Sequence, residues 1–142
     1  MIEIRIRDGA EARDLVDPFY VKNGHRTCAR DLDVFFLAMD GGTVLGCVRY
    51  CVEEGTPMLR TMMIDAAHRR RGIGSQLLRE FERYLESRGI HDVYCLPYAH
   101  LDGFYAAAGF QRVPADHAPE FLRARMRSYD PSGTAYLFMR RP

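Results

Sequence analysis

The sequence has no tryptophan, a single lysine (Lys22), and no apolar run long enough to span a membrane. Its 20 Lys and Arg residues are balanced by 19 Asp and Glu, which leaves a net charge of +1 at pH 7. Such a balance argues against a nucleic-acid-binding protein or a membrane-surface protein. Since 142 residues with 47% hydrophobic content suit one domain with a sizeable core, we expect a single domain over residues 1–142.

The four cysteines include no Cys-x-x-Cys pair, so the common zinc and redox motifs are missing. Buried free thiols in a reducing compartment are the default expectation for such cysteines. The first nine residues, MIEIRIRDG, alternate apolar and charged side chains as a strand does, and do not read as a signal peptide. We therefore expect a cytoplasmic protein with no metal cofactor, no bound nucleic acid and no membrane partner.

Two familiar phosphate-binding motifs are also missing. A Walker A loop needs Lys and then Ser or Thr after its last glycine, and no such pair follows Gly74. A Rossmann fingerprint needs a third glycine where Leu77 stands, and its acidic residue should follow the next strand. Asp92 instead precedes the apolar run at residues 93–96. Dinucleotide binding is therefore a poor fit.

The segment that organises the chain spans residues 58–89 and predicts a strand, a basic glycine-containing loop and an amphipathic helix. The first amides of a helix lack internal partners and the helix dipole is positive there, so this order of elements favours an anion site. Cations at that end cost up to about 1 kcal/mol each. Three consecutive arginines, Arg69, Arg70 and Arg71, are best explained by a bound anion, the alternative being a solvated basic turn.

Two motifs in this chain resemble those of the GNAT family of N-acetyltransferases. The spacing Arg69-x-x-Gly72-x-Gly74, between a strand and a helix, is similar to the family's acetyl-CoA motif. Downstream, residues 104–110 (Phe-Tyr-Ala-Ala-Ala-Gly-Phe) resemble its second motif, although Tyr98 stands where the family often has Asn. The resemblance covers nearly the whole chain, is best over residues 58–110, and is weak before Asp33.

The resemblance implies the α/β (α+β) GNAT acyl-CoA N-acyltransferase fold, a central mixed, mostly antiparallel sheet with helices on both faces and splayed central strands. It also implies acetyl-CoA as cosubstrate, with Tyr105 as the general acid; the alternative is that Tyr105 merely lines the cofactor channel. The backbone of Met62, Met63 and Ile64 is implied to pair with the pantetheine arm. The pyrophosphate is implied to lie on the loop and first helical turn, that is on Arg69, Arg70, Arg71, Gly72, Ile73, Gly74 and Ser75.

The implied activity is direct transfer of an acetyl group to a primary amine of a small molecule or peptide, by a monomer or homodimer. The alternative is a non-catalytic acyl-CoA sensor. The general base stays open between water and four side chains, Glu53, Glu54, His91 and His100, and for each side chain the alternative is a solvated surface residue.

Several basic residues are candidates for contacts with the acceptor. We hypothesise that Arg49 or Arg60, within expected strands, binds a carboxylate or phosphate of the acceptor, an internal ion pair being the alternative. In the irregular segment 21–33 the candidates are Lys22, His25, Arg26 and Arg30, with an ordinary solvated loop as the alternative.

Hydrophobic periodicity and turn residues predict the order β, α, three β, α, β, α, β, α, β. Asp8 or Gly9 is expected to start the first helix, which runs to about Tyr20, and Asp116 is a possible N-cap of the last. The remaining expected elements are strands at 2–6, 34–39, 44–52, 58–64, 93–96, 110–113 and 135–139, and helices at 74–88, within 104–109 and at 118–129.

Overall fold

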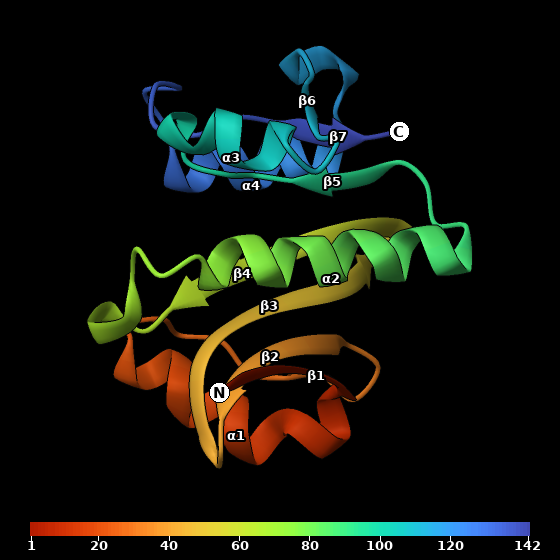
Figure 1. Ribbon diagram of the computed structural model, residues 1–142. Helices are drawn as coiled ribbons and strands as arrows, with labels where there is room; N and C mark the ends of the chain where they lie inside the picture. The colour runs from red at the N-terminus through yellow and green to blue at the C-terminus, as the bar shows by residue number, and fades with distance from the viewer. The chain divides into compact units, whose positions relative to one another are not determined.

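The chain forms two compact units in the computed structural model, which describes residues 1–142. The first unit is Met1–Ile90 and the second is His91–Pro142. Figure 1 shows their elements, which follow the expected order with three short 3-10 helices added. The single domain over residues 1–142 stays a prediction, and so does the divergence of the two central strands, because these belong to different units.

An antiparallel sheet in the order β1-β2-β3-β4 is the framework of the first unit. The β3–β4 hairpin turns through Glu54 and Gly55, whose φ angles of 47° and 77° are both positive. This is the pattern of a type I′ turn, which matches the twist of paired strands. The strands are β1 (Ile2–Asp8), β2 (Val34–Asp40), β3 (Thr43–Glu53) and β4 (Thr56–Ile64).

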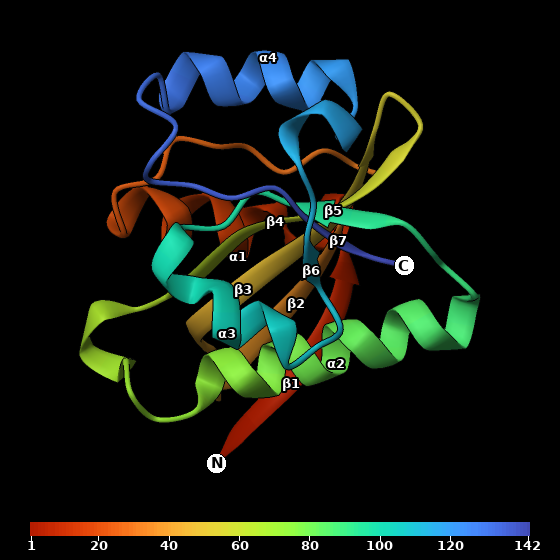
Figure 2. The same cartoon turned by 90° about the horizontal axis from the view of Figure 1, so that it is seen from above.

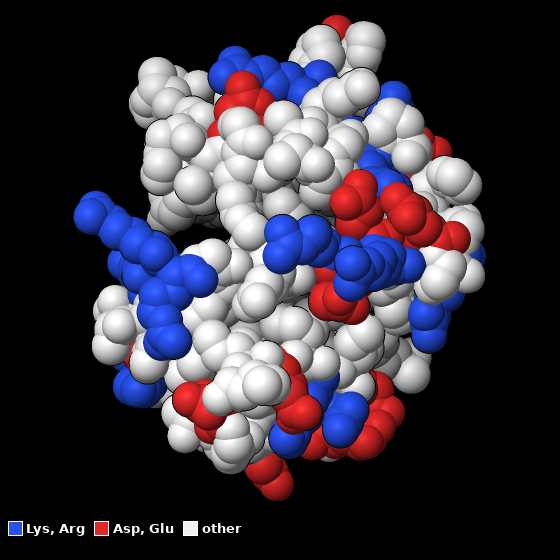
Figure 3. Space-filling model, viewed as in Figure 1, with Lys and Arg blue, Asp and Glu red and all other residues white.

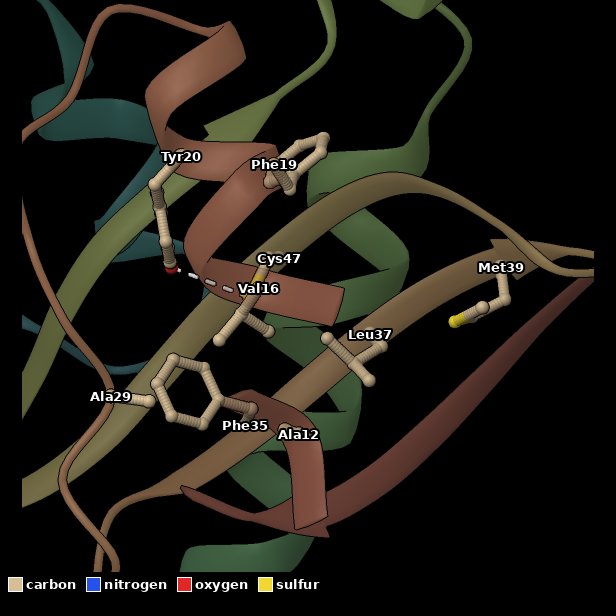
Figure 4. Close-up of a cluster of buried hydrophobic side chains, with 9 residues drawn as sticks. All are labelled: Ala12, Val16, Phe19, Tyr20, Ala29, Phe35, Leu37, Met39 and Cys47. Carbon is tan, nitrogen blue, oxygen red and sulfur yellow. Dashed lines mark hydrogen bonds between the residues drawn. The ribbon is translucent and has the colours of Figure 1, made fainter. Parts of the chain in front are cut away.

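Helix α1 (Gly9–Lys22) covers one face of this sheet. It starts where the sequence predicts, since the Asp8 carboxylate accepts a hydrogen bond of 2.9 Å from the Glu11 amide. Successive side chains of a strand point to opposite faces, so alternate residues of β2 reach α1. Figure 4 shows the resulting core: Ala12, Val16, Phe19, Tyr20, Ala29, Phe35, Leu37, Met39 and Cys47.

Helix α2 (Ile73–Arg88) covers the opposite face. The ring of Phe36, which follows Phe35 on β2, lies 5.2 Å from that of Phe81 on α2. Gly46 on β3 lets the helix approach closely, since a Cβ there would lie 3.1 Å from Ile73 Cγ2. The helix ends at Gly89, whose φ of 60° is left-handed, as expected for its C-cap.

The second unit is a small antiparallel sheet with β7 (Met139–Arg141) between β5 (Val93–Cys95) and β6 (Gln111–Arg112). Helix α3 (Asp102–Ala106) carries the second motif, and Gly109, with φ of 87°, ends its last turn. Phe110, which follows, is buried. Helix α4 (Glu120–Tyr129) follows.

Two boundaries in the second unit correct the sequence prediction. Asp116 lies in a 3-10 helix (Ala115–His117) and is not the N-cap of α4. Ala118 is extended because it precedes Pro119, so the helix starts only at Glu120. The last strand starts at Met139, four residues later than expected, because the Asp130 carboxylate binds the amides of Ala135 and Tyr136.

Candidate functional site

The loop between β4 and α2 starts at a buried carboxylate, that of Asp65. The Asp65 amide donates a hydrogen bond of 2.8 Å to the Leu45 carbonyl. The Asp65 carboxylate lies 3.4 Å from Lys22 Nζ and 3.9 Å from His68 Nε2. A 3-10 helix (Ala66–His68) follows. Asp65 thus fixes the loop to β3 and α1. Nothing in the sequence marks the burial of Asp65, because it depends on contacts with residues distant in sequence.

The N-terminus of α2 lacks the groups that ordinarily satisfy a helix start. Gly72 is the N-cap with φ of 76°, no side chain caps the helix, and its first turn contains no acid. The first hydrogen bond runs from the Gln76 amide to the Gly72 carbonyl (3.1 Å), so the amides of Ile73, Gly74 and Ser75 precede it and have no helical partner. Three amide donors at the positive end of the helix dipole suit an anion.

Arg70 adds an independent sign of function at this loop, because its φ of 64° is left-handed. A side chain in that region costs about 1–2 kcal/mol. Arg70 and Gly72 are two left-handed residues two positions apart, and such turns expose successive N–H groups to an anion. Strain of this kind concentrates at ligand-binding sites.

The three arginines are exposed on this loop. Arg69 Nε lies 3.4 Å from the Ile64 carbonyl and Arg71 Nη1 lies 2.7 Å from His68 Nδ1, whereas Arg70 makes no hydrogen bond or ion pair. Figure 3 shows basic side chains gathered at the left, over the loop that follows β4. No carboxylate neutralises them, so their charge is available to an anion.

The segment Met62, Met63 and Ile64 runs directly into this loop, which Figure 2 shows extending beyond the end of β4. All three residues are half-buried. Upstream, Thr61 has a left-handed φ of 50°, and the register with β3 shifts between the pairs Cys47↔Met63 and Arg49↔Arg60. Strand β4 therefore bulges at Thr61. The first unit thus brings together every residue expected to bind the cofactor.

Tyr105 lies on α3 in the second unit and is 4% exposed. Its ring lies 5.0 Å from that of Phe104 and 6.0 Å from that of Phe110, both edge to face. Burial, with a smaller contribution from Cys95, raises the pKa of Tyr105 above its usual value of 10. The phenol is therefore a proton donor, not a phenolate, at neutral pH.

Arg49 and Arg60 form internal ion pairs, the alternative weighed above. Arg49 is 3% exposed, with Nη1 3.4 Å from the Asp33 carboxylate and Nη2 bonded to Thr27 Oγ1 at 2.9 Å. Arg60 Nη1 lies 2.7 Å from the Glu53 carboxylate. Both positive charges are thus balanced by acids, which removes the ground for an anionic acceptor.

The candidates for acceptor contacts and for the general base have different surroundings in the structure. Lys22 pairs with Asp65, and Arg30 lies 3.6 Å from Glu53, whereas His25 and Arg26 have no charged partner. Glu53 is buried between arginines and is not the solvated residue that the sequence suggested. The other base candidates are exposed: Glu54, His91 and His100.

No three His, Cys, Asp or Glu side chains come together in a way that could hold a metal ion. None of the helices has both the length and the apolar surface needed to cross a bilayer. Cys47, Cys51 and Cys95 are buried free thiols as expected, whereas Cys28 is exposed.

A family model described as an acetyltransferase (GNAT) domain matches residues 31–112. An acyl-CoA N-acyltransferase from Pseudomonas aeruginosa has a similar structure, with 19% identity, a TM-score of 0.71 and 100% of both chains covered. The ribosomal-protein-S18-alanine N-acetyltransferase from Escherichia coli is 17% identical, with a TM-score of 0.68 and coverage of 100% of this chain and 94% of that one. A comparison with curated proteins gives no match.

A third similar structure is an N-acetylglutamate synthase from Neisseria gonorrhoeae, complexed with coenzyme A and N-acetyl-glutamate. It is 19% identical, with a TM-score of 0.66, and the match covers 99% of this chain but 35% of that one. At such identities the likeness concerns the fold. The mixed α/β fold with a mostly antiparallel sheet, expected from the two motifs, is confirmed as that of the acyl-CoA N-acyltransferases.

Proposed function

This chain belongs to the GNAT acetyltransferase family, and on that premise we propose that it transfers an acetyl group from acetyl-CoA directly to a primary amine of a small molecule or peptide. The observation that carries the proposal is the α2 N-terminus, where three amides without helical partners lie beside three exposed arginines that no carboxylate neutralises. A diphosphate carries the charge and the acceptor oxygens that such a site binds.

Acetyl-CoA is assigned to the loop and the end of β4. Arg69, Arg70 and Arg71 supply charge, and the pyrophosphate oxygens accept hydrogen bonds from backbone amides between Arg70 and Ser75. The pantetheine arm lies along Met62, Met63 and Ile64, whose backbone groups pair with it as they would with a neighbouring strand. The donor set is entirely N–H and guanidinium, which fits a diphosphate and offers no metal ligands.

Tyr105 is assigned the role of general acid. The amine nitrogen attacks the thioester carbonyl carbon and loses a proton, the carbon–sulfur bond breaks, and the phenol donates a proton to the departing thiolate before regaining one from solvent. The raised pKa of Tyr105 keeps the phenol protonated throughout the neutral range. Because a thioester is already activated, no covalent enzyme intermediate is required.

The site of cofactor binding is tested by Gly72→Val, with Gly55→Val as its control. Both glycines have a left-handed φ (76° and 77°), and nothing lies within 4 Å of the place that a Cβ would take, so the backbone strain is matched. Only Gly72 adjoins the three amides. We expect calorimetry to show CoA affinity falling about tenfold or more for Gly72→Val, equivalent to the loss of about 1.4 kcal/mol, and no change for Gly55→Val. Equal affinity in both variants would overturn the assignment.

Measurement of turnover distinguishes the proposed transferase from the competing function, a non-catalytic acyl-CoA sensor. We expect acetyl-CoA to be consumed with at least one member of a panel of primary amines, and Tyr105→Phe to lower kcat by about 100-fold while calorimetry shows unchanged acetyl-CoA binding. Binding without turnover on any amine would favour the sensor.

A further inference from the structure

We propose that His25 is the general base of the acetyl transfer, a role that rests on the function proposed above. His25 replaces the four side chains that sequence reasoning offered as bases. Three features of the first unit support this role: the position of the imidazole, the residues around it, and ring nitrogens without a hydrogen-bond partner.

The position of His25 is fixed by α1. Its amide donates a hydrogen bond of 2.8 Å to the Tyr20 carbonyl, just past the end of the helix. Its ring stands edge to face against the Tyr20 ring, with centroids 5.8 Å apart and an interplanar angle of 80°. Tyr20 is fully buried, so the imidazole rests on a rigid part of the core.

Tyr20 in turn contacts the strand assigned to the cofactor. Its hydroxyl donates a hydrogen bond of 2.7 Å to the Thr61 carbonyl, at the bulge of β4. With the pyrophosphate on the loop after Ile64, a pantetheine arm laid along β4 points its sulfur end back toward Thr61. Tyr20 thus links the imidazole to the point on β4 where the reacting thioester is expected.

The imidazole is free to accept a proton. Neither ring nitrogen makes a hydrogen bond or an ion pair, and the side chain is half-buried, so an amine can reach it. The charged groups that face it are Arg60 on β4 and Arg49 on β3, and the group from α1 is the Tyr20 phenol. Burial first, then the two arginines, lowers the pKa of His25 below 6.5, so the ring is neutral at pH 7.

The other candidates lack this combination. Glu53 already lies 2.7 Å from Arg60 and 3.6 Å from Arg30, which makes its carboxylate part of an ion-pair network. Glu54 is exposed in the hairpin turn. His91 is exposed, and the ring of His100 stacks on that of Tyr98 at 5.6 Å.

In the proposed step, the nitrogen of the neutral amine forms a bond to the thioester carbonyl carbon, and His25 takes the proton that this nitrogen loses. The electrons of the broken carbon–sulfur bond stay on sulfur, which is protonated as CoA leaves. The imidazolium then gives its proton to solvent. The sum is amine plus acetyl-CoA giving amide plus CoA.

The test is the pH dependence of kcat/KM for His25→Gln, with His91→Gln as the control, measured on the intact chain with the amine that gives turnover. For the wild type, log kcat/KM is expected to rise with slope two below the pKa of His25 and slope one above it, up to the pKa of the amine. His25→Gln should have slope one throughout, kcat lower by about 100-fold, and an unchanged KM for acetyl-CoA. His91→Gln should behave as the wild type.

Two further measurements distinguish a base from a structural residue. Added imidazole should restore part of the activity of His25→Ala. NMR titration of the histidine rings should show His25 neutral at pH 7, and Arg60→Met should raise its pKa. Wild-type turnover with unchanged slope and rate in His25→Gln would overturn the role, and so would an imidazolium at pH 7. Absence of turnover in the wild type would instead refute the proposed transferase function.

Discussion

Arg49 and Asp33 form an ion pair inside the first unit, with Nη1 3.4 Å from Oδ2 and both residues less than 5% exposed. The Arg49 guanidinium also lies over the Phe35 ring, 4.9 Å from its centroid. Breaking a buried pair by removing one charge leaves the other without compensation, which costs about 3–5 kcal/mol.

We therefore expect Asp33→Asn to lower the free energy of unfolding by about 3 kcal/mol or more, as measured by urea denaturation. Asp31→Asn is the control, because Asp31 is exposed and pairs with Arg13 at the surface, where such pairs contribute little. If both variants unfold at the same urea concentration, the buried pair is not a stabilising element.

Arg70→Gly should stabilise the protein. The left-handed φ of Arg70 costs about 1–2 kcal/mol, and glycine removes that strain for a loss of about 0.5–1 kcal/mol in chain entropy. The net expectation is a gain of up to about 1.5 kcal/mol, seen as a higher Tm. Arg69→Gly is the comparison, because Arg69 has an ordinary φ of −68° and should only lose stability. A lower Tm for Arg70→Gly than for Arg69→Gly would contradict the strain.

Gly46→Ala should weaken both the fold and CoA binding. Its Cβ would lie 2.8 Å from Ile64 Cδ1 and 3.1 Å from Ile73 Cγ2, so the Ile64 side chain must move and Ile73, at the start of α2, is pushed away from β3. Overpacking of this kind costs about 1–3 kcal/mol, and the shift would displace the amides of the first helical turn.

Gly42→Ala serves as the control for this change, since nothing lies within 4 Å of a Cβ at that turn. Thermal unfolding and calorimetry with CoA measure the two effects separately. If Gly46→Ala loses stability but keeps its affinity for CoA, the amides at the start of α2 do not depend on the packing of α2 against β3 for their positions.

Stability should fall at alkaline pH because thiols are buried. Burial raises the pKa of Cys47 and of Cys51 from 9.0 to about 12, and that of Cys95 further. A folded-state pKa above the unfolded one means that the unfolded chain loses its protons first. The stabilisation is therefore complete below pH 9 and is lost as pH rises toward 12.

The slope of stability against pH provides the measurement. Each such thiol contributes about 1.4 kcal/mol per pH unit in that window. Cys47→Ala should therefore flatten the slope by about one proton, while Cys28→Ala should leave it unchanged because Cys28 is exposed. An identical slope in all three proteins would contradict the burial argument.

The order of elements and the glycine-containing loop between β4 and α2 were predictable from the sequence because both depend on local patterns. Alternation of apolar and charged side chains predicts β1, helical spacing predicts α2, and Gly72 and Gly89 mark the two ends of α2. The boundaries that failed depend on contacts that local patterns do not contain. The late start of β7 follows from the Asp130 carboxylate, whose bonds to Ala135 and Tyr136 depend on how the turn closes.

The candidate base was not predictable for a related reason. His25 lies in a polar, irregular segment and has no periodicity to place it, and its neighbours Arg49 and Arg60 are distant in sequence. Glu53 looked like a solvated residue at a strand end, but pairing of β3 with β4 places it opposite Thr56, and its carboxylate lies within 4 Å of two arginines. Both outcomes depend on arginines that are distant in sequence and near in the fold.

The segment between α1 and β2 is anchored to α1 at both of its ends. Near its start, the His25 amide is bound to the Tyr20 carbonyl, and at its end the Gly9 amide donates to the Asp33 carbonyl at 2.7 Å. The Ala29 amide is also held, by the Asp17 carboxylate at 2.9 Å. Between these anchors, the backbone of span 26–28 makes no such hydrogen bond. An attempt to widen the range of accepted amines by lengthening the chain should therefore insert residues at that span, because an insertion between Tyr20 and His25 would break the contact that positions the imidazole.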